Sequence, residues 1–326
     1  SGPAGSGRYG SRPRFSMSVA HTPEQPRLLV IRLGALGDFV QSFGPFEAIR
    51  RAHPTAHITL LTTRPFMELA RLSPWFDEVE EDTRPRWTDW RGLLALRQHL
   101  RGYDRVFDLQ TSGRTARYFR LAGRPAGWSG HVPGAAFAHA NPWRNDMHTR
   151  ARQRDQLRMA GLEDAPPPDM GWLLAHAGIR LEPPYALLVP GASVQWAAKR
   201  WPARRYGELA RVLSARGIRP VIVGTDAEKP LAAEIRAICP DALDLAGRTS
   251  LPDLAVLAAH AWAAVGNDTG PVHLASMMGC RCLALFSHVG NPFLAAPIGR
   301  EPGQIRVIWV RDLARLSVQR VAAALW

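Results

Sequence analysis

The chain has 326 residues, 46% hydrophobic and 21% charged, a size and composition typical of a globular protein of about two domains. No apolar run approaches the ~20 residues of a membrane-spanning helix, which argues against a helical span in this sequence. The net charge of +13 raises nucleic acid or an anionic membrane as partners. No RNA-binding or helix-turn-helix signature accompanies that charge, so we do not expect a nucleic-acid partner.

The cysteines are an odd number in a long chain: Cys239, Cys280 and Cys282. Their spacing does not indicate a metal site. Because the sequence shows no secretory pattern, free buried thiols in a reducing compartment are favoured over a disulfide framework, and we expect a cytoplasmic protein.

Residues 1–26 are rich in Gly, Ser, Pro and Arg, with a single acid, Glu24. Such a segment cannot bury enough apolar surface to order itself, so a disordered tail is predicted. A buried strand is predicted over 27–33; the loop R-L-G-A-L-G-D of residues 32–38 and a helix over 39–51 follow. This order is typical of a Rossmann-like half, although the loop is not the G-x-G-x-x-G of dinucleotide binding.

Asp38 stands where that first helix starts, a position that favours an ionised carboxylate. The residues alone leave two interpretations open, a helix-capping aspartate and a functional acid. Another strand is predicted over 57–62, with Arg64 leading into the next helix. A further strand over 103–110 ends in Gln110.

Basic charge is concentrated between Arg114 and Arg158, where nine arginines face only two acids. One interpretation is a solvated basic face. The other is a binding site for a polyanionic acceptor, with Arg114 and Arg117 on the helix that follows the strand over 103–110.

Two proline-rich stretches, P-P-P at 166–168 and E-P-P at 182–184, bracket the predicted linker. We therefore divide the chain into a first domain over 27–175, a linker over 176–184 and a second domain over 185–326. A tail helix at the end of the chain, over 318–325, is predicted to pack back on the first domain.

Strands and helices alternate again in the second half, from a strand over 185–190 that ends in Gly191-Ala192-Ser193. The stretch K-R-W-P at 199–202 precedes a helix. Lys199 is one of only two lysines in the chain, which argues against a generic surface charge. A strand over 221–224 then leads to Asp226 and Glu228.

Residues 265–273 read V-G-N-D-T-G-P-V-H, a strand that ends in a turn and a new helix. Asp268 and Thr269 are predicted to cap that helix with their side chains, and Gly270 allows close backbone approach. Free N–H groups and the helix dipole converge at such a start, which is typical of an anion site. His273 follows on the first turn and shares the pocket.

Residues 267–273 resemble the D-T-G-x-x-H motif of the lipopolysaccharide heptosyltransferases, glycosyltransferase family 9. Residues 32–38 are similar to the family's first loop, residues 103–110 to its Y-D-x-V-x-D-L-Q strand, and residues 199–202 to its K-R-W-P. The resemblance covers nearly all of residues 27–326. It implies the α/β fold called GT-B: two Rossmann-like, doubly wound parallel-sheet domains that face a cleft.

The resemblance also implies an activity: inverting sugar transfer, most simply heptose from ADP-heptose, onto a lipopolysaccharide-core or lipid-A-type acceptor. No metal and no cofactor are expected, and we expect a monomer that associates peripherally with the inner face of the membrane. Asp38 would be the catalytic base, and Lys199 would stabilise the leaving diphosphate. The implied donor-binding residues are Ser193, Lys199, Glu228, Thr249, Asp268, Thr269, Gly270 and His273. The implied acceptor-binding residues are Arg64, Gln110, Arg114 and Arg117.

Several alternatives stay open. Asp226 replaces Glu228 as the ribose ligand if the register slips. Family members often continue G-P-T-D-P after the last core strand, whereas residues 287–292 read S-H-V-G-N-P, so another nucleotide sugar or glycan acceptor is possible. The remaining alternative is a non-catalytic ADP-sugar binding protein, against which the presence of both Asp38 and Lys199 argues.

Overall fold

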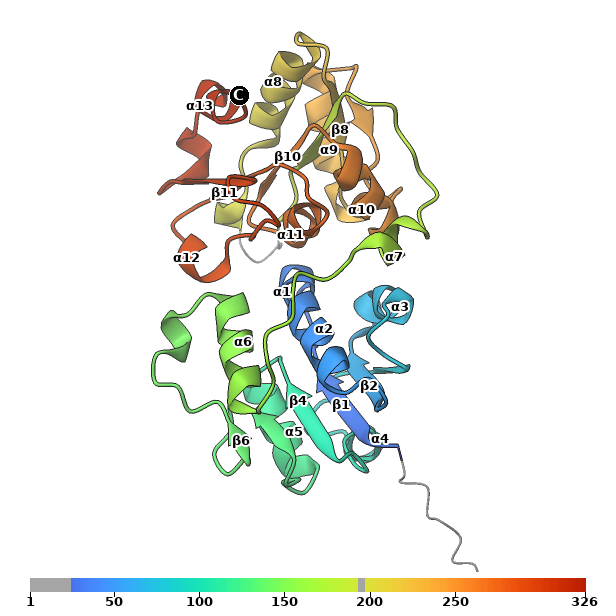
Figure 1. The fold of residues 1–326 in the computed structure, drawn as a ribbon. Coiled ribbons are helices and arrows are strands. Elements are labelled where there is room, and N and C mark those ends of the chain that lie inside the picture. Colours follow the sequence, from blue (N-terminus) through green and yellow to red (C-terminus); the bar gives the residue numbers. More distant parts are fainter. Residues whose placement is uncertain (1–24, 193–196) are drawn as a thin grey trace, which may run out of the picture.

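The computed structural model describes residues 25–192 and 197–326, which form two α/β domains stacked end to end (Figure 1). The first 24 residues, which hold most of the predicted disordered tail, lie outside the described part, as does Ser193. Within the described residues, each domain is built on a six-stranded sheet in which every neighbouring pair runs parallel. The predicted pair of doubly wound domains is confirmed.

The first sheet has the strand order β3-β2-β1-β4-β5-β6. Its strands are β1 (Arg27–Ile31), β2 (His57–Thr62), β3 (Glu78–Glu81), β4 (Arg105–Asp108), β5 (Trp128–Gly130) and β6 (Phe137–Ala138). The last four residues of β1 are buried, as expected of a parallel strand covered on both faces. The winding direction changes between β1 and β4, which lie side by side.

The second sheet has the strand order β12-β11-β10-β7-β8-β9. Its strands are β7 (Tyr185–Val189), β8 (Arg219–Ile222), β9 (Leu243–Asp244), β10 (Ala263–Asn267), β11 (Cys282–Phe286) and β12 (Ile305–Trp309). Here the winding direction changes between β7 and β10. In open parallel sheets ligands bind at such switch points, outside the carboxyl ends of the strands.

Helices cover both faces of each sheet (Figure 1). Those of the first half are α1 (Leu36–Gln41), α2 (Phe43–Ala52), α3 (Arg64–Leu72), α4 (Trp90–His99), α5 (Gly113–Leu121), η1 (Arg144–Asp146), α6 (Thr149–Met159) and α7 (Gly171–Leu174). Those of the second half are η2 (Ala197–Lys199), α8 (Ala203–Ser214), η3 (Asp226–Glu228), α9 (Lys229–Ile238), α10 (Leu251–His260), α11 (Gly270–Met277), α12 (Pro292–Ala295), η4 (Leu313–Arg315) and α13 (Val318–Ala323). The predicted helix over 39–51 is two helices, because Ser42 separates α1 from α2.

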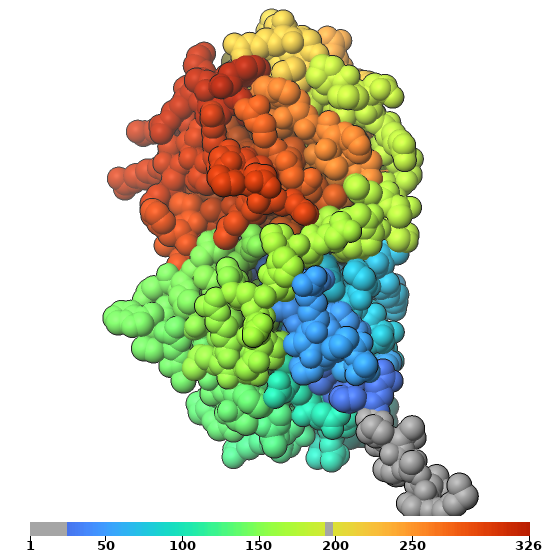
Figure 2. Space-filling model, in the orientation of Figure 1, coloured from blue at the N-terminus to red at the C-terminus, as the bar shows by residue number. Residues whose placement is uncertain are grey.

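The connecting segment between α6 and β7 runs over the surface across the domain junction (Figure 2). Trp172 of α7 packs against Trp75 of the first domain, with ring centroids 5.4 Å apart. Farther along, the backbone N–H groups of Gly178 and Ile179 donate to the Asp253 carboxylate of the second domain. The segment therefore holds to both domains.

The prediction that the tail helix packs on the first domain is wrong. Helix α13 lies against α8, and Val318, Val321 and Leu325 belong to the core of the second domain. The Trp201 indole N–H also donates to the Leu316 carbonyl, 3.0 Å away, just before the helix. Helix α8 of the same domain covers the apolar face of α13, so this face does not contact the first domain.

Candidate active site

The two switch points face each other across the junction, where α1 and α11 meet (Figure 1). Two glycines allow this contact. A Cβ on Gly270 would lie 2.5 Å from the Leu36 Cβ, and a Cβ on Gly37 would lie 2.8 Å from the His273 Cδ2. The predicted close backbone approach at Gly270 is thus a contact between domains.

Asp38 lies in the first turn of α1 on the first-domain side of this junction. Its side chain is 45% exposed, whereas that of its partner Arg32 is only 4% exposed. The Arg32 Nη2 lies 3.5 Å from the Asp38 Oδ1, and the Arg32 Nη1 donates to the Leu109 carbonyl. Burial lowers the pKa of Arg32, and the nearby Asp38 carboxylate counteracts that effect. Asp38 is therefore an accessible acid held by a buried cation.

Lys199 and Asp268 form an ion pair on the second-domain side, with 2.6 Å between Nζ and Oδ2. Asn267, which is fully buried, holds the loops around that pair. Its Oδ1 accepts from the Trp201 N–H at 2.9 Å, and its Nδ2 donates to the Pro190 carbonyl at 2.9 Å. The end of β10 thereby fixes both the end of β7 and the Lys199 loop.

The start of α11 differs from the predicted cap. Thr269 is the N-cap residue, but its side chain makes no capping hydrogen bond, and Asp268 pairs with Lys199 instead. In the described residues, the N–H groups of Thr269 and Gly270 donate to no acceptor. Free N–H groups at a helix start attract an anion, so the predicted anion site keeps its donors.

His273 connects the two sides of the junction. It is 4% exposed, and burial lowers its pKa to about 4, against the opposing effects of Asp268 and Asp38. Lys199 and His148 lower it further. Three predicted site residues from both domains thus lie close enough to shift the pKa of this imidazole, which is neutral at physiological pH.

Glu228 lies beyond the end of β8, packed beside Gly191 and Gly224. Its Oε2 accepts from the Thr225 N–H at 2.8 Å and from the Thr225 hydroxyl at 2.6 Å. The competing candidate, Asp226, is exposed and pairs with Lys229, with 2.6 Å between Nζ and Oδ1. Thr249 is half-buried after β9.

The predicted acceptor residues are spread over the first domain. The Gln110 Oε1 accepts from the Leu33 N–H at 2.9 Å and so supports the Asp38 loop. Arg64 is exposed at the start of α3. The guanidinium groups of Arg114 and Arg117 both lie over the Trp87 ring, 5.3 and 4.9 Å from its centroid.

Asp108 supports the same loop region from within the sheet. Its Oδ1 accepts from the backbone N–H groups of Gln110 and Thr111, at 3.1 and 2.9 Å. Burial raises the pKa of Asp108 to about 6, against the lowering effect of these hydrogen bonds.

Two arginines near Arg32 and Asp108, Arg144 and Arg152, were not among the predicted site residues. Arg144 is buried and donates to the Thr111 hydroxyl at 3.2 Å. Arg152 on α6 is half-buried and forms no ion pair with the described residues. It lies close enough to Arg32, Arg144 and His148 to disfavour the charged form of each, after the larger effect of burial. Only their place in the basic stretch between 114 and 158 could have indicated them.

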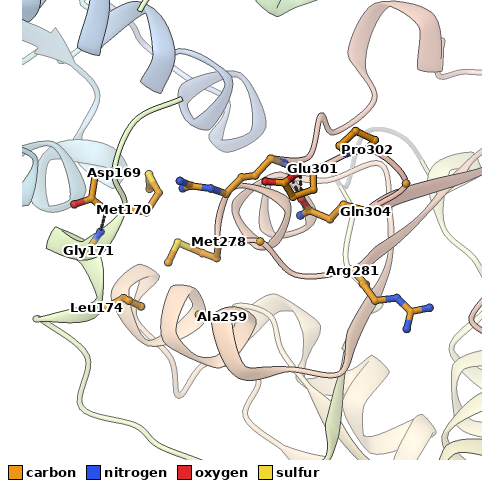
Figure 3. A pocket seen from close by; sticks show the side chains of 13 residues that line it. Asp169, Met170, Gly171, Leu174, Ala259, Met278, Arg281, Glu301, Pro302 and Gln304 are labelled. Atoms are coloured by element: carbon orange, nitrogen blue, oxygen red, sulfur yellow. Dashed lines mark hydrogen bonds between the residues drawn. The ribbon is translucent and has the colours of Figure 1, made fainter. Parts of the chain in front are cut away.

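A separate hollow of about 640 Å³ lies where α7 passes α10 (Figure 3). Met170, Leu174, Met278 and Glu301 are among its lining residues, and it includes none of the predicted site residues. In the described part of the chain, no group of three or more His, Cys, Asp or Glu side chains is arranged to hold a metal ion. No described helix is long and apolar enough to cross a bilayer.

Comparison with known proteins gives the family. The sequence model of Glycosyltransferase family 9 (heptosyltransferase) matches residues 93–317, more than half of the chain. The chain belongs to glycosyltransferase family 9. It is therefore a glycosyltransferase, and the expected membership is confirmed.

Relatives with curated names span most of this family 9 chain at low identity. It is 25% identical to the lipopolysaccharide heptosyltransferase 2 of Salmonella typhimurium, over 86% of this chain and 88% of the relative. It is 24% identical to the lipopolysaccharide core heptosyltransferase OpsX of Haemophilus influenzae, over 84% of this chain and 82% of that one. A lipooligosaccharide heptosyltransferase 2 of the same organism is 33% identical, but over only 39% of this chain and 38% of the relative.

Solved structures support the fold. The E. coli ADP-heptose lps heptosyltransferase II superposes with a TM-score of 0.70 at 24% identity, covering 92% of this chain and 97% of that one. The E. coli heptosyltransferase WaaC with ADP gives 0.72 at 19% identity, covering 91% and 98%. The family 9 chain therefore has the GT-B fold.

Proposed function

We propose that this glycosyltransferase moves a heptose from ADP-heptose onto a lipopolysaccharide-core acceptor, with inversion, as a monomer, and without metal or cofactor. The observation that carries the proposal is the contact between α1 and α11, which brings the first turn of α1, with Asp38, to the start of α11. An accessible carboxylate on one domain thus faces an anion site on the other. The relatives named for heptosyl transfer support the choice of sugar and acceptor.

In this mechanism Asp38 accepts the proton of the acceptor hydroxyl as that oxygen attacks the anomeric carbon. The bond from that carbon to the diphosphate breaks, and ADP leaves with the electron pair. Lys199 and the N–H groups of Thr269 and Gly270 stabilise the growing charge on the diphosphate. Glu228 binds the ribose through the oxygen that Thr225 leaves open, with Thr249 near the base.

We propose that the acceptor lies on the first-domain side and that Arg152 binds its anionic groups. The position of Arg152, half-buried and without an acidic partner in the described residues, supports this role, because a guanidinium binds phosphate and carboxylate as a fork. Arg64, Arg114 and Arg117 extend the basic surface outward. The enzyme is cytoplasmic and associates peripherally with the inner face of the membrane.

The test is a mass-spectrometric transfer assay with ADP-heptose and a heptose-free core acceptor, run in EDTA. Nuclear magnetic resonance of the product then gives the anomeric configuration. Transfer with inversion in EDTA supports the proposal, whereas a retained configuration or loss of activity in EDTA contradicts its mechanism. ADP binding without transfer to any glycan acceptor would make the protein a binding protein.

The acceptor role is tested with Arg152→Gln. We expect a rise of at least tenfold in the acceptor KM and an unchanged donor KM. Arg158→Gln is the matched control, since Arg158 lies on the same helix, is exposed and pairs with Asp164. Equal acceptor KM values for the two variants would remove Arg152 from the acceptor site.

A further inference from the structure

An exposed aromatic pair lies on the second domain, at the edge of its sheet. Phe293 of α12 and Trp309, the last residue of β12, pack edge to face with ring centroids 5.9 Å apart. Phe293 is 75% exposed and Trp309 is 49% exposed. Val307 is also exposed and lies on the same face of β12 as Trp309, because side chains two apart in a strand point the same way. Clustered apolar side chains on a surface indicate a binding partner.

A basic hollow of about 780 Å³ lies beyond the ends of the neighbouring strands β11 and β12. Arg311, Arg315 and Arg320 line it, and its single acid is Asp312. Asp312 lies 3.7 Å from the Arg315 Nε and offsets one of the three arginine charges. In the described residues, Arg311 and Arg320 form no ion pair. The hollow therefore carries a net positive charge.

Backbone contacts join the hollow to the aromatic pair. The Trp309 indole N–H donates to the Ser287 carbonyl at 3.1 Å, and the His288 Nδ1–H donates to the Arg311 carbonyl at 2.7 Å. Residues that follow the neighbouring strands β11 and β12 thus build both parts. We call the two parts together the strand-end surface: Phe293, Val307, Trp309, Arg311, Arg315 and Arg320.

We propose that the strand-end surface is where this protein rests on an anionic lipid bilayer. Exposed aromatic rings suit the boundary between lipid headgroups and acyl chains, where Phe293 and Trp309 would lie with the Trp309 N–H still bonded to Ser287. Arginines at that depth are attracted by the negative potential of anionic lipids, an effect of about fivefold in affinity for each. An exposed aromatic pair and three arginines on the segment that follows β12 have this combined chemistry.

The position of the surface relative to the domain junction agrees with this role, which rests on the proposed transfer to a lipopolysaccharide-core acceptor. Helix α12 lies beside α6 at the domain junction (Figure 1). The His148 Nε2–H donates to the Ala296 carbonyl at 2.9 Å, and the Thr149 hydroxyl donates to the Leu294 carbonyl at 3.2 Å. A bilayer on the strand-end surface therefore lies next to the domain junction, where the proposed acceptor binds.

The test is cosedimentation of the full chain with vesicles of phosphatidylcholine alone or mixed with phosphatidylglycerol. We expect binding to the mixed vesicles only, weakened by salt. Phe293→Ser with Trp309→Ser should reduce that binding at least tenfold, and Arg311→Gln with Arg315→Gln and Arg320→Gln about a hundredfold. The controls are Trp90→Ser, an aromatic side chain 66% exposed on the first domain, and Arg204→Gln on α8. ADP affinity confirms that each variant is folded.

Three results would overturn the proposal. The first is absence of binding to the mixed vesicles, and the second is an equal loss of vesicle binding in the control variants. The third is a changed oligomeric state of the double variant, Phe293→Ser with Trp309→Ser, when no vesicles are present. The last would assign the surface to a second copy of the chain. Transfer to a soluble, truncated acceptor separates this inference from the proposed function. Intact transfer without vesicle binding contradicts only the inference, and vesicle binding without transfer contradicts only the function.

Discussion

The buried Arg32 guanidinium lies 3.5 Å from the half-exposed Asp38 carboxylate, so the acid at the domain junction has a cation behind it and solvent in front. We expect Asp38→Asn to lower turnover by ~10²–10⁴-fold, because a general base contributes about that much. ADP affinity should stay unchanged, because the nucleotide residues lie on the other domain. Calorimetry with ADP and saturating kinetics measure the two effects. More than about a tenth of the wild-type rate would mean that Asp38 only starts the helix.

Arg32 itself is expected to be a positioning residue. Arg32→Gln removes the cation behind Asp38 and the donor to the buried Leu109 carbonyl. Turnover should fall at least tenfold while the donor KM holds, and Arg32→Lys should recover part of the rate by restoring the charge. If Arg32 had only a structural role, both variants would have a lower free energy of unfolding. The turnover of the folded enzyme would then be unchanged.

The features that the sequence predicted well depend on short stretches of chain. The loops after β1 and β10 carry glycine and helix-start signals within a few residues, and the structure places both at the switch points. The signal for Arg32 is weak, since a single charge after an apolar run does not show whether it is buried. Its partner, Asp38, is near in the sequence, but the two side chains come together only because the loop between them turns.

Tertiary packing accounts for what the sequence could not predict. The apolar face of α13 fits any apolar surface, and only the fold places α8 next to it. Likewise, each arginine between 114 and 158 has the same charge, but their partners differ. Arg154 and Arg158 pair with Asp164, whereas Arg152 forms no ion pair with the described residues and lies near Arg32. Sequence spacing does not distinguish these cases.

Lys199 and Asp268 should show strong coupling in nucleotide binding. Lys199→Ala removes a cation for the diphosphate and also leaves the Asp268 carboxylate, only 11% exposed, without its partner. We therefore expect ADP affinity to fall at least tenfold in Lys199→Ala and to recover partly in Lys199→Ala with Asp268→Asn. Coupling of contacting residues is typically ~0.5–3 kcal/mol. Additive effects in calorimetric titrations would contradict a shared site.

Glu228→Gln is expected to behave differently from Lys199→Ala. A ribose contact is about equal in the ground and transition states, so the donor KM should rise with little change in kcat. Steady-state kinetics at saturating acceptor measure both constants. The same fall in kcat for both variants would show that one of the two roles is misassigned.

Gly37 and Gly270 should be required because only a residue without a Cβ fits between α1 and α11. Their backbone freedom is not the reason. A Cβ at Gly270 meets Leu36, and one at Gly37 meets His273, so alanine at either position forces the helices apart. We expect each variant to lose ~1–3 kcal/mol of unfolding free energy, as in other overpacked sites, and to lower kcat. Gly44→Ala is the control, because nothing lies within 4 Å of its Cβ position in α2. An equal loss in that variant would contradict the contact.

His273 should make the enzyme less stable as the pH falls. Its pKa is about 4 in the folded protein and 6.5 when unperturbed, so the unfolded chain binds more protons between these values. The stability that the neutral imidazole contributes is present above pH 6.5 and is lost as the pH falls through 4. The shift corresponds to about 3 kcal/mol, since one pKa unit is worth ~1.4 kcal/mol. Denaturant unfolding of the ligand-free protein and of His273→Gln, at pH 7 and pH 4.5, measures the difference. The advantage of the wild type over the variant should shrink toward pH 4.5, and a constant advantage would show that the buried imidazole is charged or freely hydrated.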